Sequence, residues 1–205
     1  KAEIKEEFLQ RIQLTSAPRT ALIGIVSRLA TQKGFDLLFD SLPLLLQARE
    51  FNLVVLGTGE PRYENFFSGL QRRFPTRVHF ERRYSDELAH WIEAASDMFL
   101  MPSRYEPCGL NQMYSLRYGT VPIVRRTVGL ADSVQHFDAA SGSGTGIVFN
   151  DYNAEAVTWG LNTALDLYQN KGIWRRLMQN GMAQDYSWSR QVRGYVELYE
   201  SIVQP

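Results

Sequence analysis

Two basic side chains, Arg28 and Lys33, follow directly after a short apolar run over residues 20–26. A run of this length and composition is typical of a strand buried on both faces of a parallel sheet. Ligands of such sheets bind beyond the carboxyl ends of the strands. Because arginine can hold two oxygens at once and lysine adds a point charge, the pair suits a diphosphate. Charge alone leaves open that both are ordinary solvated residues.

A second segment, PSRYEPCGLNQ over residues 102–112, links a predicted strand to a predicted helix over 109–118. The N-terminus of a helix presents free backbone N–H groups and the positive end of its dipole, which would stabilise an anion such as a leaving diphosphate. Gly109 would let a ligand come close to the backbone. Glu106 stands just before that end. It could cap the helix, bind sugar hydroxyls or stabilise positive charge at an anomeric carbon.

A third segment, RRTVGLAD over residues 125–132, also follows a predicted strand. Its Gly129 could offer backbone N–H groups to phosphate or sugar, or could simply form a turn. Tyr84 follows the predicted strand over 77–81, where an aromatic ring could stack on a base or pack in the core. The three segments therefore meet at the same predicted edge of the sheet.

Other chemistries lack the residues that they need. Cys108, the single cysteine, has no histidine near it in the sequence, so we expect a small packed residue rather than a nucleophile. The three histidines show no metal-ligand spacing with Cys, Asp or Glu, and we expect no metal. The chain contains neither a Gly-x-Gly-x-x-Gly fingerprint after its first strand nor a phosphate-loop GKS or GKT, which disfavours a dinucleotide oxidoreductase and a nucleoside triphosphatase.

The elements that must position these segments alternate between strand and helix over about 150 residues. The predicted strands cover residues 20–26, 52–56, 77–81, 97–101, 121–124 and 146–149. The predicted helices cover residues 1–12, 35–47, 62–74, 85–94 and 109–118, with Ser85 as an N-cap and Pro43 as a weak point, and three more follow residue 153. The alternation predicts an α/β fold, a Rossmann-like doubly wound parallel sheet of about six strands with a helical C-terminal tail.

Composition sets the broad class. The 205 residues carry 22 basic and 22 acidic side chains, and 44% are hydrophobic, so neither a nucleic acid nor a membrane surface is an expected partner. Because no apolar stretch approaches about 18 residues, we expect no transmembrane helix. The first residues, KAEIKEEF, do not resemble a signal peptide, and we expect the sequence to be cut from a longer protein.

The three segments together resemble the bacterial glycogen synthase and plant starch synthase family. The resemblance rests on GIVSRLATQKGFDLL, MPSRYEPCGLNQMYSLRYGTVPIVRRTVGLADSV and YSWSRQVRGYVELY, and extends from near Lys1 to near Pro205. It implies the C-terminal, donor-binding domain of a GT-B glycosyltransferase, whose active site lies between two Rossmann-like domains. Residues 1–205 would form that one domain, with the helices over about 153–205 packed on it and toward the missing N-terminal domain.

The resemblance also implies roles for individual residues. Those matching Arg28 and Lys33 bind the donor diphosphate, and the one matching Glu106 lies at the donor glucose and is needed for turnover. The tyrosine matching Tyr84 packs on the adenine. The full set of expected donor contacts is Tyr84, Cys108, Gly109, Leu110, Asn111, Thr127, Gly129 and Leu130.

Three positions mark differences within the family. Family members usually have a second glycine at Val128, so a left-handed backbone there would cost energy in this chain. They often have threonine at Asn111. Related retaining transferases have a glutamate at Tyr114, whereas glycogen and starch synthases commonly have tyrosine, so Tyr114 places the chain nearer to the latter.

The resemblance implies transfer of glucose from ADP-glucose to the non-reducing end of an α-1,4-glucan with retention, without cofactor or metal. Expected partners are ADP-glucose or ADP, the glucan and the missing domain. The location would be cytoplasmic in a bacterium and the plastid stroma in a plant. Two alternatives stay open: a non-catalytic nucleotide-sugar-binding module, and a related retaining glycosyltransferase with another donor or acceptor.

Overall fold

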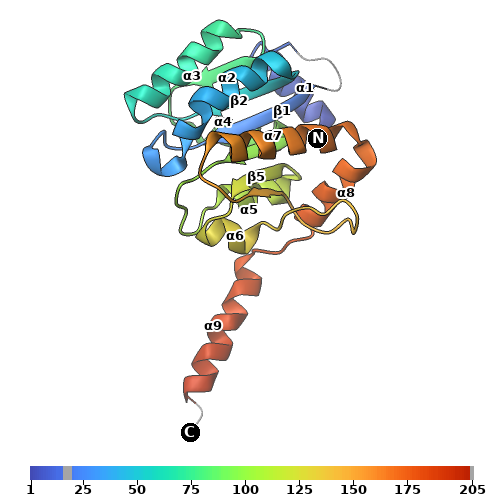
Figure 1. Cartoon of the computed structure of the whole chain (residues 1–205). Helices are drawn as coiled ribbons and strands as arrows, with labels where there is room; N and C mark the ends of the chain where they lie inside the picture. Colours follow the sequence, from blue (N-terminus) through green and yellow to red (C-terminus); the bar gives the residue numbers. More distant parts are fainter. Residues whose placement is uncertain (16–19, 204–205) are drawn as a thin grey trace.

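The computed structural model describes residues 1–15 and 20–203, and these form a parallel six-stranded sheet with helices on both faces (Figure 1). The strands are β1 (Ala21–Val26), β2 (Phe51–Leu56), β3 (Val78–Glu81), β4 (Met98–Met101), β5 (Val121–Arg125) and β6 (Ile147–Phe149). The helices are α1 (Ala2–Arg11), η1 (Thr31–Lys33), η2 (Phe35–Leu37), α2 (Leu38–Ala48), α3 (Pro61–Arg73), α4 (Asp86–Ala95), α5 (Asn111–Tyr118), α6 (Val128–Ser133), α7 (Ala154–Gln169), α8 (Lys171–Met182) and α9 (Trp188–Val203). All six strands lie close to their predicted ranges, which confirms the α/β prediction.

The strand order is β3-β2-β1-β4-β5-β6, and every pair in it is parallel. The sheet therefore grows from β1 in both directions, which is the doubly wound arrangement. The register places Ile23 beside Met98 and Gly24 beside Phe99 at the β1–β4 pair. This pair is where the direction of winding reverses.

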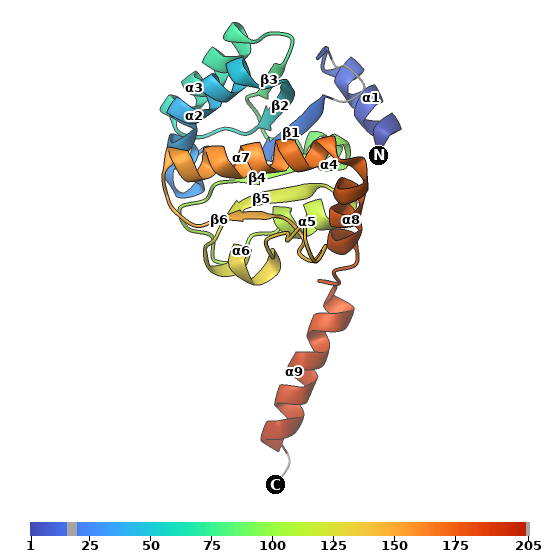
Figure 2. The same ribbon diagram turned by 45° about the vertical axis from the view of Figure 1, so that its right-hand side comes forward.

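Alternation along the strands divides the core into two layers. In β1, Ile23 and Ile25 join the apolar cluster under α2, α3 and α7, whereas Leu22 joins the cluster under α1, α4 and α6. Successive side chains of a strand point to opposite faces, so continuous apolar strands are what a sheet covered on both sides requires. Figure 2 shows α7 lying across one face of this sheet.

Two local expectations about helices have clear outcomes. Ser85 caps α4 as predicted, because its hydroxyl oxygen accepts a hydrogen bond from the Leu88 N–H at 3.2 Å. Pro43 lies inside α2 and does not end it. The helix continues through the proline because its leucines on the core-facing side are buried against the sheet. Burial thus outweighs the lost backbone hydrogen bond.

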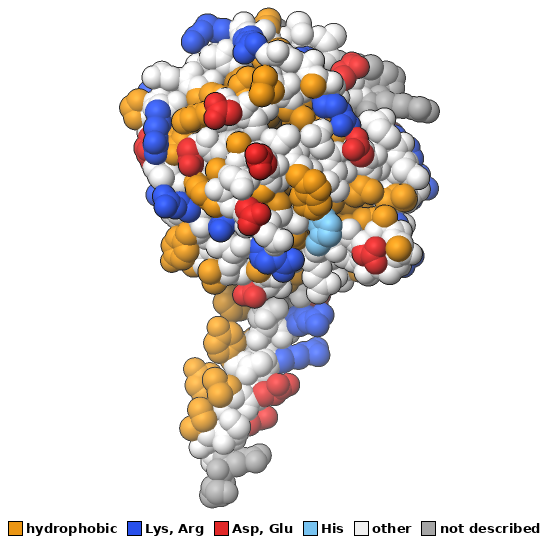
Figure 3. All heavy atoms as spheres, in the orientation of Figure 1, with side chains coloured by type: hydrophobic (Ala, Val, Ile, Leu, Met, Phe, Trp, Pro, Cys, Tyr) orange, Lys and Arg blue, Asp and Glu red, His pale blue; other side chains and the backbone are white. Residues whose placement is uncertain are grey.

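The C-terminal helices behave in two different ways. Buried side chains of α7 and α8, such as Leu161 and Trp174, join the core. By contrast α9, which we expected to pack on the domain as well, projects away from the sheet and has no buried residue (Figure 1). One side of α9 is hydrophobic and the other carries charged side chains (Figure 3). Its pattern makes it an amphipathic helix, but no described part of the chain covers the apolar side.

None of the helices within residues 1–15 and 20–203 combines the length and the apolar character needed to cross a bilayer.

Candidate active site

A cleft of about 370 Å³ opens at the carboxyl ends of β1 and β4. This is the crevice in which doubly wound sheets bind their ligands, because the connections leaving β1 and β4 turn toward opposite sides there. The residues that line it are Val26, Ser27, Arg28, Lys33, Phe35, Leu100, Met101, Pro102, Ser103, Glu106, Gly109, Leu110 and Asn111. Six residues predicted from the sequence, Arg28, Lys33, Glu106, Gly109, Leu110 and Asn111, thus line a single cleft.

The loop after β1 presents its two cations differently. The Arg28 side chain is exposed and makes no ion pair or hydrogen bond with the rest of the described chain. Lys33 ends the short helix η1, which is held by Glu60: the Thr31 N–H donates to Glu60 Oε1 at 2.7 Å. The hydrogen bonds from the Thr31 N–H and hydroxyl lower the pKa of Glu60 below its usual value, which keeps this carboxylate ionised.

Glu106 faces the cleft and does not cap a helix. Its Oε2 lies 2.5 Å from Lys33 Nζ, and the Ser103 hydroxyl donates to the same oxygen at 3.3 Å. The Glu106 side chain is 8% exposed, while that of Lys33 is 20% exposed. Helix α5 has no side-chain cap, so the capping alternative is excluded and the carboxylate belongs to the cleft wall.

The start of α5 presents backbone donors to the cleft. Gly109 has φ +72°, a left-handed conformation that favours glycine, and an added Cβ would meet the Gln112 side chain. The N–H groups of Gly109, Leu110 and Asn111 find no acceptor in the part of the chain that the structure describes. Free N–H groups at the positive end of a helix are suited to an anion. The cleft therefore combines two cations, a carboxylate and unpaired backbone donors.

Asn111 and Gln112 hold this helix end in place. Asn111 Nδ2 donates to the Val26 carbonyl at 2.8 Å and thereby ties α5 to the last residue of β1. The buried Gln112 amide donates to the carbonyls of Cys108 and Gly109 at 2.9 and 3.1 Å. No role for Gln112 is predictable from the sequence, because a polar residue in a motif does not show by itself which carbonyls it bonds.

Gln32 is a second residue that sequence reasoning missed. Its carbonyl accepts hydrogen bonds from the Arg104 and Tyr105 N–H groups at 2.9 and 3.4 Å, and its side chain donates to the Tyr105 carbonyl at 3.1 Å. The Gly34 backbone, with φ +72°, packs directly against the Pro102 carbonyl. The loops after β1 and β4 are consequently joined along their backbones.

The third predicted segment forms the short helix α6, which we had not predicted. Gly129 does more than form a turn: its N–H donates to the Glu106 carbonyl at 3.1 Å, and its Cα lies too close to Pro107 and Cys108 for any side chain. Val128 has φ +23°, so the left-handed backbone considered from the sequence is present at a β-branched residue. The Leu130 side chain is fully buried in the core, and Thr127 is partly exposed at the start of α6. Thr127, Gly129 and Leu130 do not line the cleft.

Tyr84 and Cys108 also lie outside the cleft lining. The Tyr84 side chain is 85% exposed after the edge strand β3, so it is not the core tyrosine that was one of our two interpretations. Cys108 is exposed, which contradicts the expectation of a packed residue. Its own carbonyl accepts from Gln112, and the carbonyl of Glu106 in the same loop accepts from the Gly129 N–H.

Histidines have structural surroundings. His136 Nδ1 accepts a hydrogen bond from the Val148 N–H at 3.1 Å and thereby supports β6. Burial is the main cause that lowers its pKa. No group of three or more His, Cys, Asp or Glu side chains arranged to hold a metal ion occurs among residues 1–15 and 20–203.

Comparison with known proteins shows which family has this fold and this cleft. The family model for glycosyl transferases group 1 matches residues 6–180, which include the whole sheet and all the residues that line the cleft. The chain belongs to this family. Its six-stranded sheet is that of the C-terminal domain of GT-B glycosyltransferases. The resemblance noted in the sequence is thereby confirmed at the level of family and fold.

Individual relatives place the chain within the family. It is 48% identical over 206 residues to a glycogen synthase of Koribacter versatilis and 45% identical over 201 residues to one of Thermotoga petrophila. Among solved structures, the catalytic domain of starch synthase IV from Arabidopsis thaliana, bound to ADP and acarbose, matches 98% of the chain with a TM-score of 0.87 and 34% identity. Anabaena HepE in complex with UDP and glucose shares the fold, with a TM-score of 0.74 and 17% identity.

The chain spans less than half the length of the two glycogen synthases and of the starch synthase chain. The alignment with the Koribacter protein covers 100% of the chain and 42% of that protein. The alignment with the Thermotoga protein covers 98% and 41%, and that with the starch synthase chain covers 98% and 42%.

Proposed function

We propose that this chain is the donor-binding domain of a glycogen or starch synthase. The parent protein would transfer glucose from ADP-glucose to the non-reducing end of an α-1,4-glucan with retention of configuration. The observation that carries the proposal is the cleft at the β1–β4 switch point, where Arg28, Lys33, Glu106 and the free N–H groups of α5 meet. The identity to glycogen synthases over the whole chain supports the same assignment.

Each part of the cleft has a role in this proposal. Arg28, Lys33 and the N-terminal end of α5 bind the donor diphosphate and stabilise its charge as the glycosidic bond breaks. Charges held in place before the reaction act in this way without reorganisation. Glu106 hydrogen-bonds the donor glucose or stabilises positive charge that develops at the anomeric carbon. In this scheme the fixed cations neutralise the leaving group, and neither a metal nor another cofactor takes part.

The remaining length of the relatives supports a second half in the parent protein. We propose that this half, an N-terminal GT-B domain, closes the cleft and supplies much of the glucan site. The chain alone would then bind ADP weakly and transfer little or no glucose. Because the two glycogen synthases named above are bacterial, we favour the bacterial cytoplasm over a plastid as the location.

ADP rather than UDP is the proposed nucleotide, and calorimetry can test it. ADP and UDP are titrated into the wild type, Lys33→Ala and Arg28→Ala. We expect tighter binding of ADP than of UDP, and a loss of about tenfold or more in each variant, because each removes a charge-assisted contact to phosphate. Arg72→Ala is the matched control, since Arg72 is also an exposed guanidinium without a described partner.

The outcomes separate the alternatives. Preference for UDP would favour a related retaining transferase with another donor. Equal ADP affinity of wild type and Lys33→Ala would contradict the proposal that the diphosphate binds in this cleft. ADP binding in the chain together with no glucosyl transfer by the parent protein would favour a non-catalytic binding module.

A further inference from the structure

The two cations of the cleft differ in their protein partners. Arg28 is exposed and has no ionic partner within the described residues, whereas Lys33 Nζ is already paired with Glu106 Oε2 at 2.5 Å. A diphosphate that enters the cleft therefore meets one free cation and one occupied cation. To bind Lys33 it must replace or share the carboxylate of Glu106.

Burial makes this competition matter. The side chains of Glu106 and Lys33 are 8% and 20% exposed, so their attraction is screened by solvent less than that of a surface pair. The Ser103 hydroxyl donates to the same Glu106 oxygen at 3.3 Å. If Lys33 turned to a phosphate, Glu106 would keep the Ser103 hydrogen bond and would not be left without any donor.

The pair can open without moving the loops that carry it. Lys33 and Glu106 lie on the loops after β1 and β4, and those loops are joined independently by the hydrogen bonds between Gln32 and residues 104–105 and by the contact of Gly34 with Pro102. The Gly129 N–H holds the Glu106 carbonyl as well. The ion pair is therefore a side-chain contact between backbones that are already fixed.

We propose that Glu106 pairs with Lys33 until the donor binds and that the donor diphosphate then displaces it, exchanging one oxyanion partner of Lys33 for another. This proposal rests on the proposed function and adds a regulatory step to its site. The arrival of the diphosphate releases the Glu106 carboxylate beside the donor, where the sugar is then bound. Glu106 thus opposes nucleotide binding through Lys33 even though the reaction needs it.

The proposal makes an unusual prediction for Glu106→Gln. A residue that only contacts the donor weakens binding when it is replaced. Here the substitution frees Lys33, so we expect Glu106→Gln to bind ADP about fivefold more tightly than wild type, a size in the range of a partly exposed ion pair. Glucosyl transfer by the parent protein falls in the same variant. Thermal unfolding of each variant checks that it is folded.

A double-mutant cycle shows whether the gain passes through Lys33. ADP is titrated by calorimetry into wild type, Glu106→Gln, Lys33→Ala and the double variant. The exchange predicts that Glu106→Gln tightens binding in the wild-type background and has no effect once Lys33 is alanine. If Lys33→Ala binds too weakly to measure, the double variant must be equally weak, and recovery of binding in it would overturn the exchange.

The remaining outcomes are also decisive. Equal or weaker binding of ADP by Glu106→Gln would overturn the exchange while leaving the donor site in place. An equal gain in both backgrounds would show that Glu106 simply repels anions, which also overturns it. No binding of ADP by any of the four proteins would overturn the donor-site assignment itself, and the exchange with it.

Discussion

The sheet has a lysine–carboxylate pair at each end, and the two pairs have the same length. Lys5 Nζ lies 2.5 Å from Asp97 Oδ2 at the amino ends of β1 and β4, and Lys33 Nζ lies 2.5 Å from Glu106 Oε2 at their carboxyl ends. Their surroundings differ. From this difference we expect the atoms around each ion pair, rather than its length, to decide whether the pair is structural or exchangeable.

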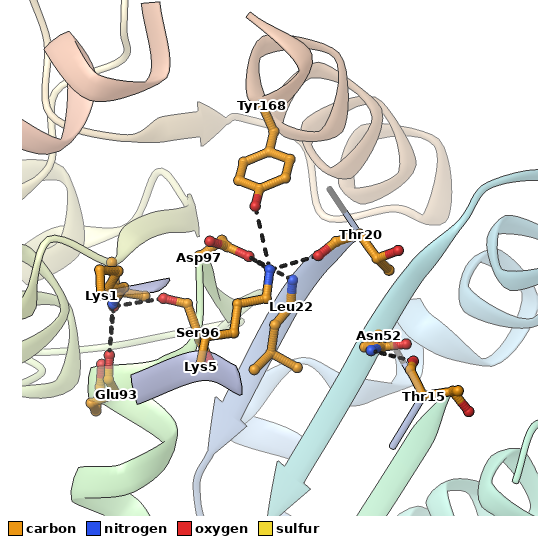
Figure 4. Close-up of polar contacts among 11 residues, drawn as sticks. Lys1, Lys5, Thr15, Thr20, Leu22, Asn52, Glu93, Ser96, Asp97 and Tyr168 are labelled. Atoms are coloured by element: carbon orange, nitrogen blue, oxygen red, sulfur yellow. Dashed lines mark hydrogen bonds and ion pairs between the residues drawn. The ribbon is translucent and has the colours of Figure 1, made fainter. Parts of the chain in front are cut away.

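At the amino end both members of the pair bond to further protein groups. Lys5 Nζ also donates to the Thr20 carbonyl at 2.6 Å and the Tyr168 hydroxyl at 3.3 Å, while Asp97 Oδ2 accepts from the Leu22 N–H at 2.8 Å (Figure 4). This pair joins α1, β1, β4 and α7 in one buried network. Within the described residues both charges are thus engaged by several protein groups.

At the carboxyl end the pair borders open space. The cleft lies beside Lys33 and Glu106, Arg28 stands unpaired among the described residues, and the N–H groups at the start of α5 are free. These features leave unused binding capacity. We therefore expect substitutions at the amino end to change stability, and substitutions at the carboxyl end to change binding.

We expect the largest effect on stability from Lys5→Met, because this substitution leaves Asp97 buried without its cation. We expect a loss of about 3 to 5 kcal/mol in the free energy of unfolding, measured by denaturant titration, because breaking one side of a buried pair strands the other charge. Lys33→Met is the matched control and should lose less, about 1 to 2 kcal/mol, because Glu106 keeps the Ser103 hydroxyl and borders an open cleft from which water can reach its carboxylate. ADP affinity should show the reverse order, with Lys5→Met unchanged wherever it is folded. Similar losses of stability in both variants would contradict the distinction between a structural pair at the amino ends of the strands and an exchangeable pair at their carboxyl ends.

A smaller effect is expected at Glu93, a buried carboxyl of α4. Burial raises its pKa from 4.5 to about 8, its Oε2 accepts from the Ser115 hydroxyl at 2.7 Å, and its Oε1 has no described partner. Between those two pKa values the folded protein holds a proton that the unfolded chain has released, so stability falls as the pH rises from about 5 to about 8. Lys1, near Glu93, opposes this by attracting the ionised form.

Glu93→Gln should remove this pH dependence. We expect the free energy of unfolding of the variant to rise relative to that of wild type by about 1 to 2 kcal/mol as the pH increases from about 6 to about 8, measured by denaturant unfolding at each pH. Glu60→Gln is a useful contrast at the carboxyl end, because the pKa of Glu60 is lowered and its contribution is lost only toward acid pH. A constant difference between Glu93→Gln and wild type across the range would contradict the assignment.

The smallest effect is expected at Val128, where the carboxyl end stores backbone strain. Val128→Gly should stabilise the protein by about 1 kcal/mol, because glycine accepts φ +23° and the relief exceeds its entropic cost. Thr127→Gly is the control: Thr127 has φ −151°, an extended backbone, so this glycine should only destabilise. Equal losses in the two variants, compared by thermal unfolding, would show that Val128 is not strained.

Much of the fold was predictable because each strand is a short apolar run between turn residues. Helix α6 was not, since a six-residue helix is held by the Gly129 contact with Glu106 and by the burial of Leu130, which depend on distant segments. The residue pattern of α9 indicates a helix with an apolar side, but the residues of the helix do not show what covers that side. The sequence therefore predicts α9 as an element and fails to predict its surroundings.

The candidate site was predictable in position and not in detail. Arg28, Lys33 and Glu106 meet because residues at the carboxyl ends of neighbouring parallel strands share one edge. Their pairing depends on side-chain conformations across two loops, and spacing cannot show it. Tyr84 could stack on a base or pack in the core by its place in the sequence, and only the family resemblance chose the base; its exposed position after β3 is set by the sheet order.

Gly34 carries a consequence for how this cleft tolerates change. Any side chain there would collide with the Pro102 carbonyl and would also have to adopt φ +72°. In a saturation mutagenesis screen, position 34 should thus be as intolerant as the charged residues, although it offers no functional group to a ligand. Positions needed for packing and positions needed for binding would then look alike in such a screen. Stability measurements on each variant would distinguish Gly34, whose substitution destabilises the contact between the loops, from the residues that bind.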